Sequence, residues 1–258
     1  MINFAYYLRT TLMMELLRRM GPVTKNLLIL NVLIWAFCAL TPASTSARLI
    51  DTCALHYFSS PGFRVWQLFT YMFVHVEFWH LLCNMFALVM FGTFIEWAIG
   101  RERYIFYYLS CGVGAALIQE GVFAIMISKY QSMFSPEEYS YIIREGWHAM
   151  QQGLMFVEPN AAALTQLVNA PVIGASGAIF GILLAYAMLW PNRELYIMFI
   201  PVPVKAKWVI VGYTVLELSM GIGGVDDGVA HFAHLGGMAV GFVIIYIWNK
   251  RHTFSGWY

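Results

Sequence analysis

The chain has 258 residues, of which 60% are hydrophobic, 17% are aromatic and only 11% are charged. Soluble domains carry about a quarter charged residues, so this composition excludes an ordinary soluble protein and indicates a polytopic membrane protein. The formal net charge of +1 argues against nucleic acid as a partner. The four cysteines, Cys38, Cys53, Cys83 and Cys111, show no metal-binding or redox spacing. Three of them lie in apolar segments, which argues against a disulfide framework.

The N-terminal stretch, residues 1–21, is basic and amphipathic. Arg9, Arg18 and Arg19 lie among leucines and methionines, and no small-residue cleavage site follows them. We therefore interpret this stretch as a cytosolic helix lying on the inner membrane face, with a disordered tail as the alternative.

Six apolar segments then follow, each a candidate for a membrane-spanning helix of about 20 residues. The first and the fifth are short, so they need flanking residues or a thin bilayer. Together the segments predict one six-helix membrane domain over residues 22–250, followed by a cytosolic tail at 251–258. The predicted spans are Leu27–Leu40, Phe78–Ile99, Tyr104–Ile127, Pro171–Trp190, Trp208–Ile222 and Val229–Trp248.

The distribution of basic residues predicts the orientation of these spans. If the N-terminus faces inward, eleven lysines and arginines fall in the inner segments and only four in the outer ones. Because positive residues accumulate on the cytosolic side, both termini are predicted to face the cytosol.

Two predicted outer segments are long. Residues 41–77 are rich in aromatic residues and contain Pro42 and Pro61, which indicates a semi-buried interfacial loop. Residues 129–170 form a more polar insertion. Within it, Ser135 precedes Pro136 and two glutamates, a helix-start pattern that predicts an external amphipathic helix over about 136–152.

The few polar residues inside the spans are candidates for function, because their burial in a membrane is costly. Asn84, Ser176 and His234 each lie 16 or 17 residues before the basic residue at the inner end of their span. At about 1.5 Å of rise per residue, all three lie roughly 25 Å above that end. This depth is a little below the outer surface of a hydrocarbon core of about 30 Å. His80 lies one turn above Asn84.

A hydroxyl, an imidazole and a side-chain amide at one depth are the groups that acyl transfer requires. Ser176 can supply the nucleophile and His234 the general base. Asn84 and His80, with the backbone N–H of Ser176, can stabilise an oxyanion. The only acid in the fifth span, Glu217, is predicted to lie deeper in the membrane, so we expect a serine–histidine dyad without a third carboxylate.

Glycines are spaced to let the fourth and sixth spans approach each other closely. Gly177 and Gly181 form one GxxxG pair, and Gly237 and Gly241 form another. Phe180, one turn below Ser176, is predicted to form a floor beneath the imidazole. Taken singly, a serine among glycines or a lone histidine in a span is more often a packing residue than a catalytic one.

The ordered set of motifs resembles the rhomboid family of intramembrane serine proteases, of the bacterial type with six transmembrane helices. The matching segments are HLLCN at 80–84, GASG at 174–177 and AHLGGMAVG at 233–241, on the second, fourth and sixth spans. The resemblance covers roughly residues 22–250. It implies an all-α, rhomboid-like bundle with a membrane-embedded first external loop, Ser176 as nucleophile, His234 as base, and His80 and Asn84 in the oxyanion hole. It also implies that spans 2 and 5 flank substrate access.

Three features depart from the family pattern. Many relatives carry Trp-Arg where this chain has Trp66-Gln67, and a tyrosine is frequent where this chain has Phe180. The 129–170 insertion is longer than in compact bacterial members. His75, His148 and His231 match no catalytic position and are interpreted as interfacial or loop histidines.

The function predicted from these observations is an intramembrane serine endopeptidase in the bacterial inner membrane, with no cofactor and no metal. Its partners would be membrane lipid and single-span membrane proteins, cut near their external end. No HExxH motif and no pair of intramembrane aspartates supports another protease class. A catalytically inactive rhomboid-like protein that binds membrane segments, or a small transporter, stays open as an alternative. The sequence leaves the oligomeric state open.

Overall fold

The computed structural model describes residues 20–196, 202–223 and 230–251. The predicted cytosolic helix at 1–21 and the tail at 251–258 fall almost wholly outside the described residues. The described chain is helical throughout most of its length, with one short two-stranded hairpin. This confirms the all-α class.

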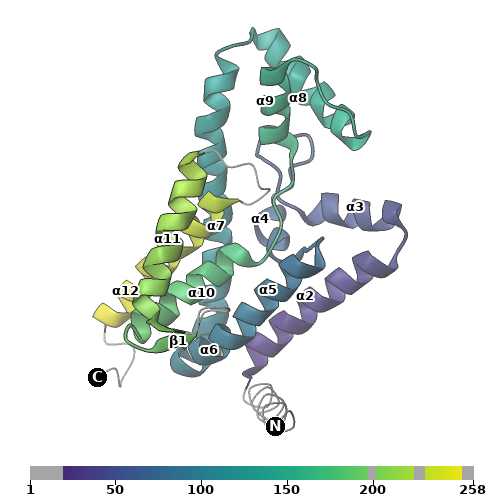
Figure 1. The fold of residues 1–258 in the computed structure, drawn as a ribbon. Helices are drawn as coiled ribbons and strands as arrows, with labels where there is room; N and C mark the ends of the chain where they lie inside the picture. The colour runs from purple at the N-terminus through teal and green to yellow at the C-terminus, as the bar shows by residue number, and fades with distance from the viewer. Residues whose placement is uncertain (1–19, 197–201, 224–229, 252–258) are drawn as a thin grey trace.

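Helices occur at all six predicted spans (Figure 1). The second is a composite of α5, a π-helical turn η2 and α6. Four of the helices are long and apolar enough to cross a membrane: α2, α5–α6, α7 and α12. α10 is apolar but has only 14 residues, and α11 has 18. The bounds are α2 Pro22–Leu40, α5 Phe78–Ala87, η2 Leu88–Gly92, α6 Thr93–Ile99, α7 Arg101–Gln131, α10 Ser176–Leu189, α11 Ala206–Gly223 and α12 His231–Lys250.

The fourth helix starts later than predicted. It begins at Ser176 instead of Pro171, because the preceding residues form an extended segment in which Val172 pairs with Leu55 of the first outer loop. Gly174 then turns the chain with a φ of 115°, a conformation that residues with a side chain rarely adopt. The serine therefore lies at the first position of the helix.

Helices α7, α10 and α12 form the centre of the bundle, where they pack against one another. α7 contributes three fully buried tyrosines, Tyr104, Tyr107 and Tyr108. The hydroxyl of Tyr107 donates to the carbonyl oxygen of Gly181 on α10 at 2.7 Å. A large apolar ring thus fills the interior while its polar atom is hydrogen-bonded, as burial of a phenol requires.

A buried glutamate ties α2 to the rest of the bundle. Glu96 of α6 accepts hydrogen bonds from the backbone N–H groups of Val23 and Thr24, at 3.0 and 2.8 Å, and from the Thr24 hydroxyl at 2.8 Å. The first N–H groups of a helix have no partner within it, and the helix dipole favours an anion there. One carboxylate therefore caps α2 and fixes its position against α6.

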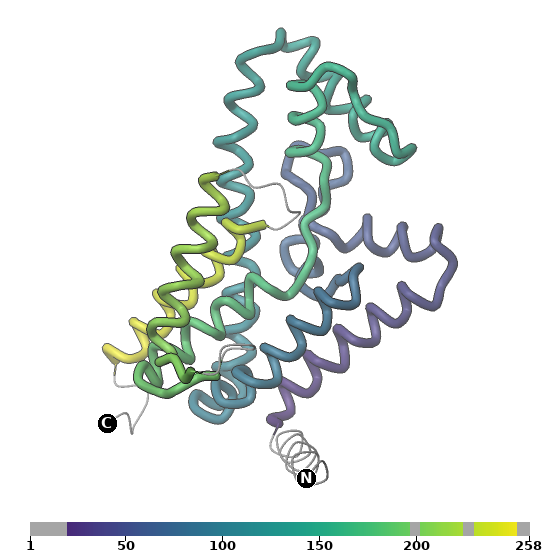
Figure 2. The backbone as a smooth tube through the Cα atoms, in the orientation of Figure 1, coloured from purple at the N-terminus to yellow at the C-terminus, as the bar shows by residue number. Residues whose placement is uncertain are grey.

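The outer insertion is built on an extension of α7, which runs to Gln131 (Figure 2). α8, Pro136–Gln151, confirms the predicted helix, and its external location stays a prediction. Its start is a capping box: the Ser135 hydroxyl accepts from the Glu138 N–H at 3.2 Å, and the Ser135 N–H donates to the Glu138 carboxylate at 2.8 Å.

A second helix of the insertion, α9 at Pro159–Asn169, is absent from the sequence prediction. Glu158 caps it by accepting from the N–H groups of Ala161 and Asn160. These two hydrogen bonds to the charged form lower the pKa of the Glu158 carboxyl. A small apolar core joins α7, α8 and α9, so the insertion is a folded unit: Ile127, Ile142, Ile143, Ala161, Leu164 and Val168.

The first outer segment also contains more structure than the predicted loop. It includes an 11-residue helix α3, Ala43–Cys53, a short helix α4, Gln67–Thr70, and a 3-10 turn η1, Tyr71–Phe73. α3 is amphipathic, with its apolar residues on one face of the helix, and none of its residues is fully buried. α3 follows the upper end of α2 and runs back toward α4 at an angle to α2 (Figure 1).

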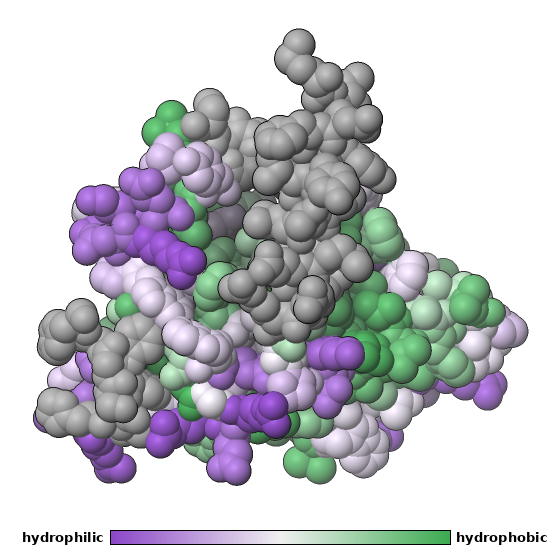
Figure 3. All heavy atoms as spheres, turned by 90° about the horizontal axis from the view of Figure 1, so that it is seen from below, coloured by the Kyte–Doolittle hydropathy of each residue, from purple (hydrophilic) through white to green (hydrophobic). Residues whose placement is uncertain are grey.

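The start of α2 and the end of α12 lie at the same end of the bundle, opposite α8 and α9 (Figure 1). At this end a hairpin joins α10 to α11, with β1 (Glu194–Tyr196) antiparallel to β2 (Pro203–Lys205). Viewed from below, hydrophilic side chains gather over this end, while hydrophobic ones extend along the flank at right (Figure 3). This polarity supports the predicted inner face, whose assignment to the cytosol stays a prediction.

Removal of the Glu96 carboxylate should destabilise the bundle. In Glu96→Ala the N–H groups and the hydroxyl at the start of α2 lose their acceptor in an apolar environment, which costs about 3 kcal/mol for charge-assisted hydrogen bonds of this kind. We expect a lower melting temperature in detergent. Glu102→Ala, which removes an exposed glutamate of α7, is the matched control. Equal melting temperatures for the two variants would contradict the capping role.

Candidate active site

Ser176 is held at the start of α10 by contacts on both sides. Before it, the Gly174 N–H donates to the carbonyl oxygen of Tyr71 at 3.0 Å, which fixes the turn. After it, the Ile179 N–H donates to the carbonyl oxygen of Ala175 at 3.0 Å and begins the helix. The N–H of Ser176 is among the first of the helix, where the dipole is positive and favours an anion.

His234, in the first turn of α12, faces the serine. Its Nε2 lies 2.7 Å from the Ser176 Oγ. The ring stacks on Phe180 of α10, with centroids 4.2 Å apart and an interplanar angle of 14°. Phe180 therefore forms the floor that the sequence predicted, and it fixes the plane of the imidazole by stacking alone.

His80 and Asn84 of α5 lie beside the turn that precedes the serine. A side chain on Gly174 would meet the His80 ring, since an ideal Cβ there lies 2.6 Å from its Cε1 atom. Asn84 is buried, and its Nδ2 lies 3.2 Å from the Nε2 of His75. The four residues predicted to form the site, Ser176, His234, His80 and Asn84, thus surround one turn of chain.

His75 belongs to this group, although it lies in the loop between η1 and α5, as predicted for a loop histidine. It is fully buried, and its Nε2 also accepts from the Ala175 N–H at 3.4 Å. Since a side-chain amide and a backbone N–H both donate to Nε2, the ring proton lies on Nδ1. An imidazole within the apolar run FTYMFVHV is itself a signal, because a buried ring of this kind needs polar partners.

The glycines bring α10 and α12 into backbone contact at one point. An ideal Cβ on Gly237 would overlap the carbonyl oxygen of Gly177, and one on Gly181 would lie 3.1 Å from the carbonyl oxygen of Gly237. Gly241 instead faces the Tyr107 hydroxyl of α7. The expectation that both glycines of α12 face α10 therefore holds for Gly237 and is wrong for Gly241.

A carboxylate lies next to the histidine, so the expectation that none is near is wrong. The Oε2 of Glu217, on α11, is 2.9 Å from the Nδ1 of His234 and 2.7 Å from the Nδ1 of His231. His231 is likewise buried at the start of α12 and is not a loop residue. Sequence reasoning missed this pair because Glu217 precedes the histidines on a separate helix, and its depth placed it too far from the site.

This arrangement can perform nucleophilic chemistry. A serine hydroxyl within hydrogen-bond distance of an imidazole can lose its proton to that ring as it attacks a carbonyl carbon. The Ser176 N–H and the side chains of His80 and Asn84 lie around the same turn and are groups that can donate hydrogen bonds to an oxyanion.

Comparison with known proteins identifies the family. The family model described as the Rhomboid domain matches residues 62–251, which is most of the chain. The chain belongs to the rhomboid family. The matched region ends next to the predicted domain boundary at 250 and begins later than residue 22, so that predicted start stays a prediction.

Several curated rhomboid proteins are similar to this one. RHOMBOID-like protein 12, mitochondrial, of Arabidopsis thaliana is 29% identical over 179 residues, 69% of this chain and 44% of that protein. Rhomboid protein 1, mitochondrial, of Saccharomyces cerevisiae is 28% identical over 180 residues, 68% of this chain and 39% of that protein. Rhomboid-like protein 11, chloroplastic, of Arabidopsis thaliana is 26% identical over 200 residues, 73% of this chain and 55% of that protein.

The alignments thus span less than half the length of the first two relatives. The family and the apolar helices make this chain an integral membrane protein. The relatives are named for mitochondria and a chloroplast, so the bacterial inner membrane stays a prediction.

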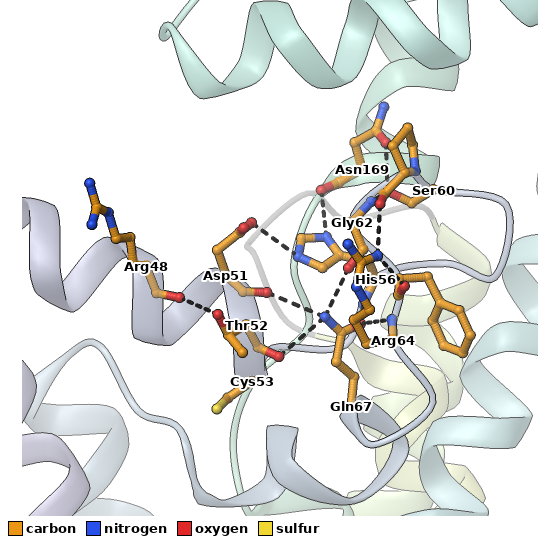
Figure 4. Close-up of polar contacts among 12 residues, drawn as sticks. Arg48, Asp51, Thr52, Cys53, His56, Ser60, Gly62, Arg64, Gln67 and Asn169 are labelled. Atoms are coloured by element: carbon orange, nitrogen blue, oxygen red, sulfur yellow. Dashed lines mark hydrogen bonds and ion pairs between the residues drawn. The ribbon is translucent and has the colours of Figure 1, made fainter.

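Gln67, which departs from the family's Trp-Arg pattern, organises the first outer loop of this rhomboid (Figure 4). The buried side chain accepts from the N–H groups of His56 and Arg64, at 3.3 and 3.1 Å. Its Nε2 lies 3.0 Å from the Gly62 carbonyl oxygen and 3.3 Å from that of Asp51. One neutral amide therefore connects several loop segments that form no regular secondary structure with one another.

The same loop is joined to the insertion. The Nδ1 of His56 lies 3.0 Å from the Asn169 carbonyl oxygen, and the Ser60 hydroxyl donates to the Asn169 side chain at 2.8 Å (Figure 4). The His56 ring also meets Trp147 of α8 edge to face, with centroids 5.2 Å apart. His148, in contrast, is exposed in the last turn of α8, so it lies on a helix and its interfacial position stays a prediction.

A single methyl group at Gly237 should separate α10 from α12. In Gly237→Ala the new Cβ overlaps backbone and cannot be accommodated by a side-chain rotation, so we expect a lower melting temperature and loss of Ser176 labelling by a fluorophosphonate. Gly212→Ala on α11 is the control, because an ideal Cβ there meets nothing within 4 Å among the described residues. Unchanged labelling and stability in Gly237→Ala would contradict the packing.

Proposed function

We propose that this rhomboid protein is an intramembrane serine endopeptidase in which Ser176 is the nucleophile and His234 the general base. The observation that carries the proposal is the 2.7 Å separation between the serine Oγ and the histidine Nε2. In a rhomboid-like protein that only binds membrane segments, nothing requires these two groups to meet at hydrogen-bond distance.

The reaction follows from this geometry. The Ser176 oxygen attacks the scissile carbonyl carbon while its proton passes to the Nε2 of His234. The ring then gives that proton to the leaving amine, and a water molecule hydrolyses the acyl-enzyme by the same route. Acylation and deacylation each return the histidine to its neutral state, so peptide hydrolysis consumes only the peptide and one water molecule.

The N–H of Ser176 and the side chains of His80 and Asn84 would form the oxyanion hole. Asn84 uses one amide proton toward His75 and keeps a second one for the substrate. Loss of one such donor typically costs about 10²–10³ in rate. The helix start at Ser176 adds the positive end of the α10 dipole to the same place.

The substrate would be a membrane protein with a single span, cut near its external end. Ser176 lies at the outer end of a short helix, below the outer loop and the insertion (Figure 1). A transmembrane helix hides its carbonyl groups in internal hydrogen bonds, so the scissile stretch must unwind before attack. Membrane lipid is the second partner, because 60% of the residues are hydrophobic and many apolar side chains are exposed.

Substitution of either member of the dyad should abolish proteolysis. Ser176→Ala removes the nucleophile and His234→Ala removes the base, while neither removes a residue of the Gly177–Gly237 contact. We expect cleavage of a membrane substrate to fall to background in both variants with the melting temperature retained. Near-wild-type turnover in either one would overturn the assignment, and an inactive wild type that a fluorophosphonate does not label at Ser176 would favour the inactive rhomboid-like alternative.

Substrate cleavage should depend on how easily the upper substrate helix unwinds. A model single-span substrate with Gly and Pro in its outer part is compared with a variant in which both are replaced by Leu. We expect the first to be cut faster, near its external end, since helix-breaking residues expose the scissile carbonyl. Equal rates would contradict the unwinding requirement, and a cut at the cytosolic end would contradict the predicted topology.

A further inference from the structure

A buried carboxylate on α11 lies between two histidines of α12. His231 and His234 are three residues apart, on one face of the helix, and their Nδ1 atoms lie 2.7 and 2.9 Å from the Oε2 of Glu217. All three side chains are buried. The contact from His231 has hydrogen-bond geometry, whereas that from His234 has the distance but is bent away from the N–H direction.

These separations suit a hydrogen-bonded group better than a metal centre. Two ligands of one tetrahedral zinc ion, each about 2.1 Å from the metal, lie roughly 3.4 Å apart. The glutamate oxygen is closer than that to both nitrogens. A hydrogen bond between His231 and Glu217 accounts for the shorter of the two distances without an ion.

The tautomer of His234 follows from its two neighbours. As general base it accepts the Ser176 proton at Nε2, so its own ring proton lies on Nδ1, 2.9 Å from the Oε2 of Glu217. A carboxylate accepts hydrogen bonds and does not donate them, so it favours this tautomer over the inactive one. When Nε2 takes up the serine proton, the ring becomes a cation beside an anion.

We propose that Glu217 is a positioning residue that holds His234 in its reactive tautomer and stabilises the imidazolium, with His231 orienting the carboxylate from the other side. This rests on the proposed function of Ser176 and His234. No proton reaches Glu217 in the cycle: the proton moves from the serine oxygen to Nε2 and then to the leaving amine. The bent contact straightens as the substrate binds, because hydrogen bonds in the free enzyme often align only in the complex.

The same contact has a second consequence that the experiment must separate. Among the described residues of α11, only Ala206, Ile210 and Glu217 are buried, and the first two lie in its inner half. Glu217 is thus the buried attachment of the outer half of α11 to α12. If it served only to hold α11 closed against the bundle, its loss would loosen the helix and leave the chemistry of Ser176 intact.

The experiment uses Glu217→Gln, which keeps size and one acceptor oxygen but removes the charge, and Glu217→Asp, which restores the charge on a shorter side chain. Ser219→Ala is the control, since this exposed residue of the same helix donates only to the Val215 carbonyl oxygen in the described contacts. For each protein the first-order inactivation rate and the apparent affinity for a fluorophosphonate are measured separately, together with the melting temperature.

We expect Glu217→Gln to lower the inactivation rate by about 10²-fold, because general-base catalysis contributes at least this factor. Reagent affinity and melting temperature should change little. Glu217→Asp should recover part of the rate, and Ser219→Ala should match the wild type. For a membrane substrate we expect Glu217→Gln to lower kcat by the same factor, about 10²-fold, and to leave KM unchanged.

A rate in Glu217→Gln equal to or above that of the wild type would overturn the positioning role and favour a latch on α11. A fall in melting temperature in Glu217→Gln, with no recovery of rate in Glu217→Asp, would overturn it in favour of a structural role. Both outcomes differ from failure of the proposed function itself, in which wild-type Ser176 is unlabelled or Ser176→Ala still cleaves the substrate.

Discussion

The approach of α10 and α12 at Gly177 and Gly237 is the constraint on which the site depends. At this point the two helices meet backbone to backbone, so any side chain at Gly237 would hold them apart. The contact lies one turn inward of His234 and next to Ser176, and it sets the 2.7 Å separation between their reacting atoms. In a membrane, where lipid is as apolar as a side chain, close packing of small residues is a main source of helix association.

Buried polar side chains define how the remaining elements attach to this central pair. Glu96 caps α2, Gln67 holds the first outer loop, and Glu217 joins α11 to α12. Asn84 meets His75 beside the turn that carries the serine. A polar group without a partner is costly in an apolar environment, so each of these groups specifies one arrangement of the helices it joins. The result is an apolar bundle whose geometry is fixed by a few directional contacts.

The insertion is connected to the site through the chain itself. Asn169, at the end of α9, contacts His56 and Ser60 of the first outer loop. A few residues later the extended segment pairs Val172 with Leu55, and the serine turn follows. The folded core of α8 and α9 is therefore braced against the same loop that supports the serine turn. A conformational change in the insertion would have a short physical route to the start of α10.

By itself, the sequence determined the six helical segments, the external helix begun at Ser135 and the residues that surround the serine turn, because these signals are local: apolar length, capping and short motifs. Only the tertiary structure decided that Glu217 and His75 join the site. Their partners lie on other helices or loops, and the rotation of a helix cannot be read from a sequence in which lipid-facing and protein-facing positions are equally apolar. The three-dimensional packing alone determines which polar group meets which.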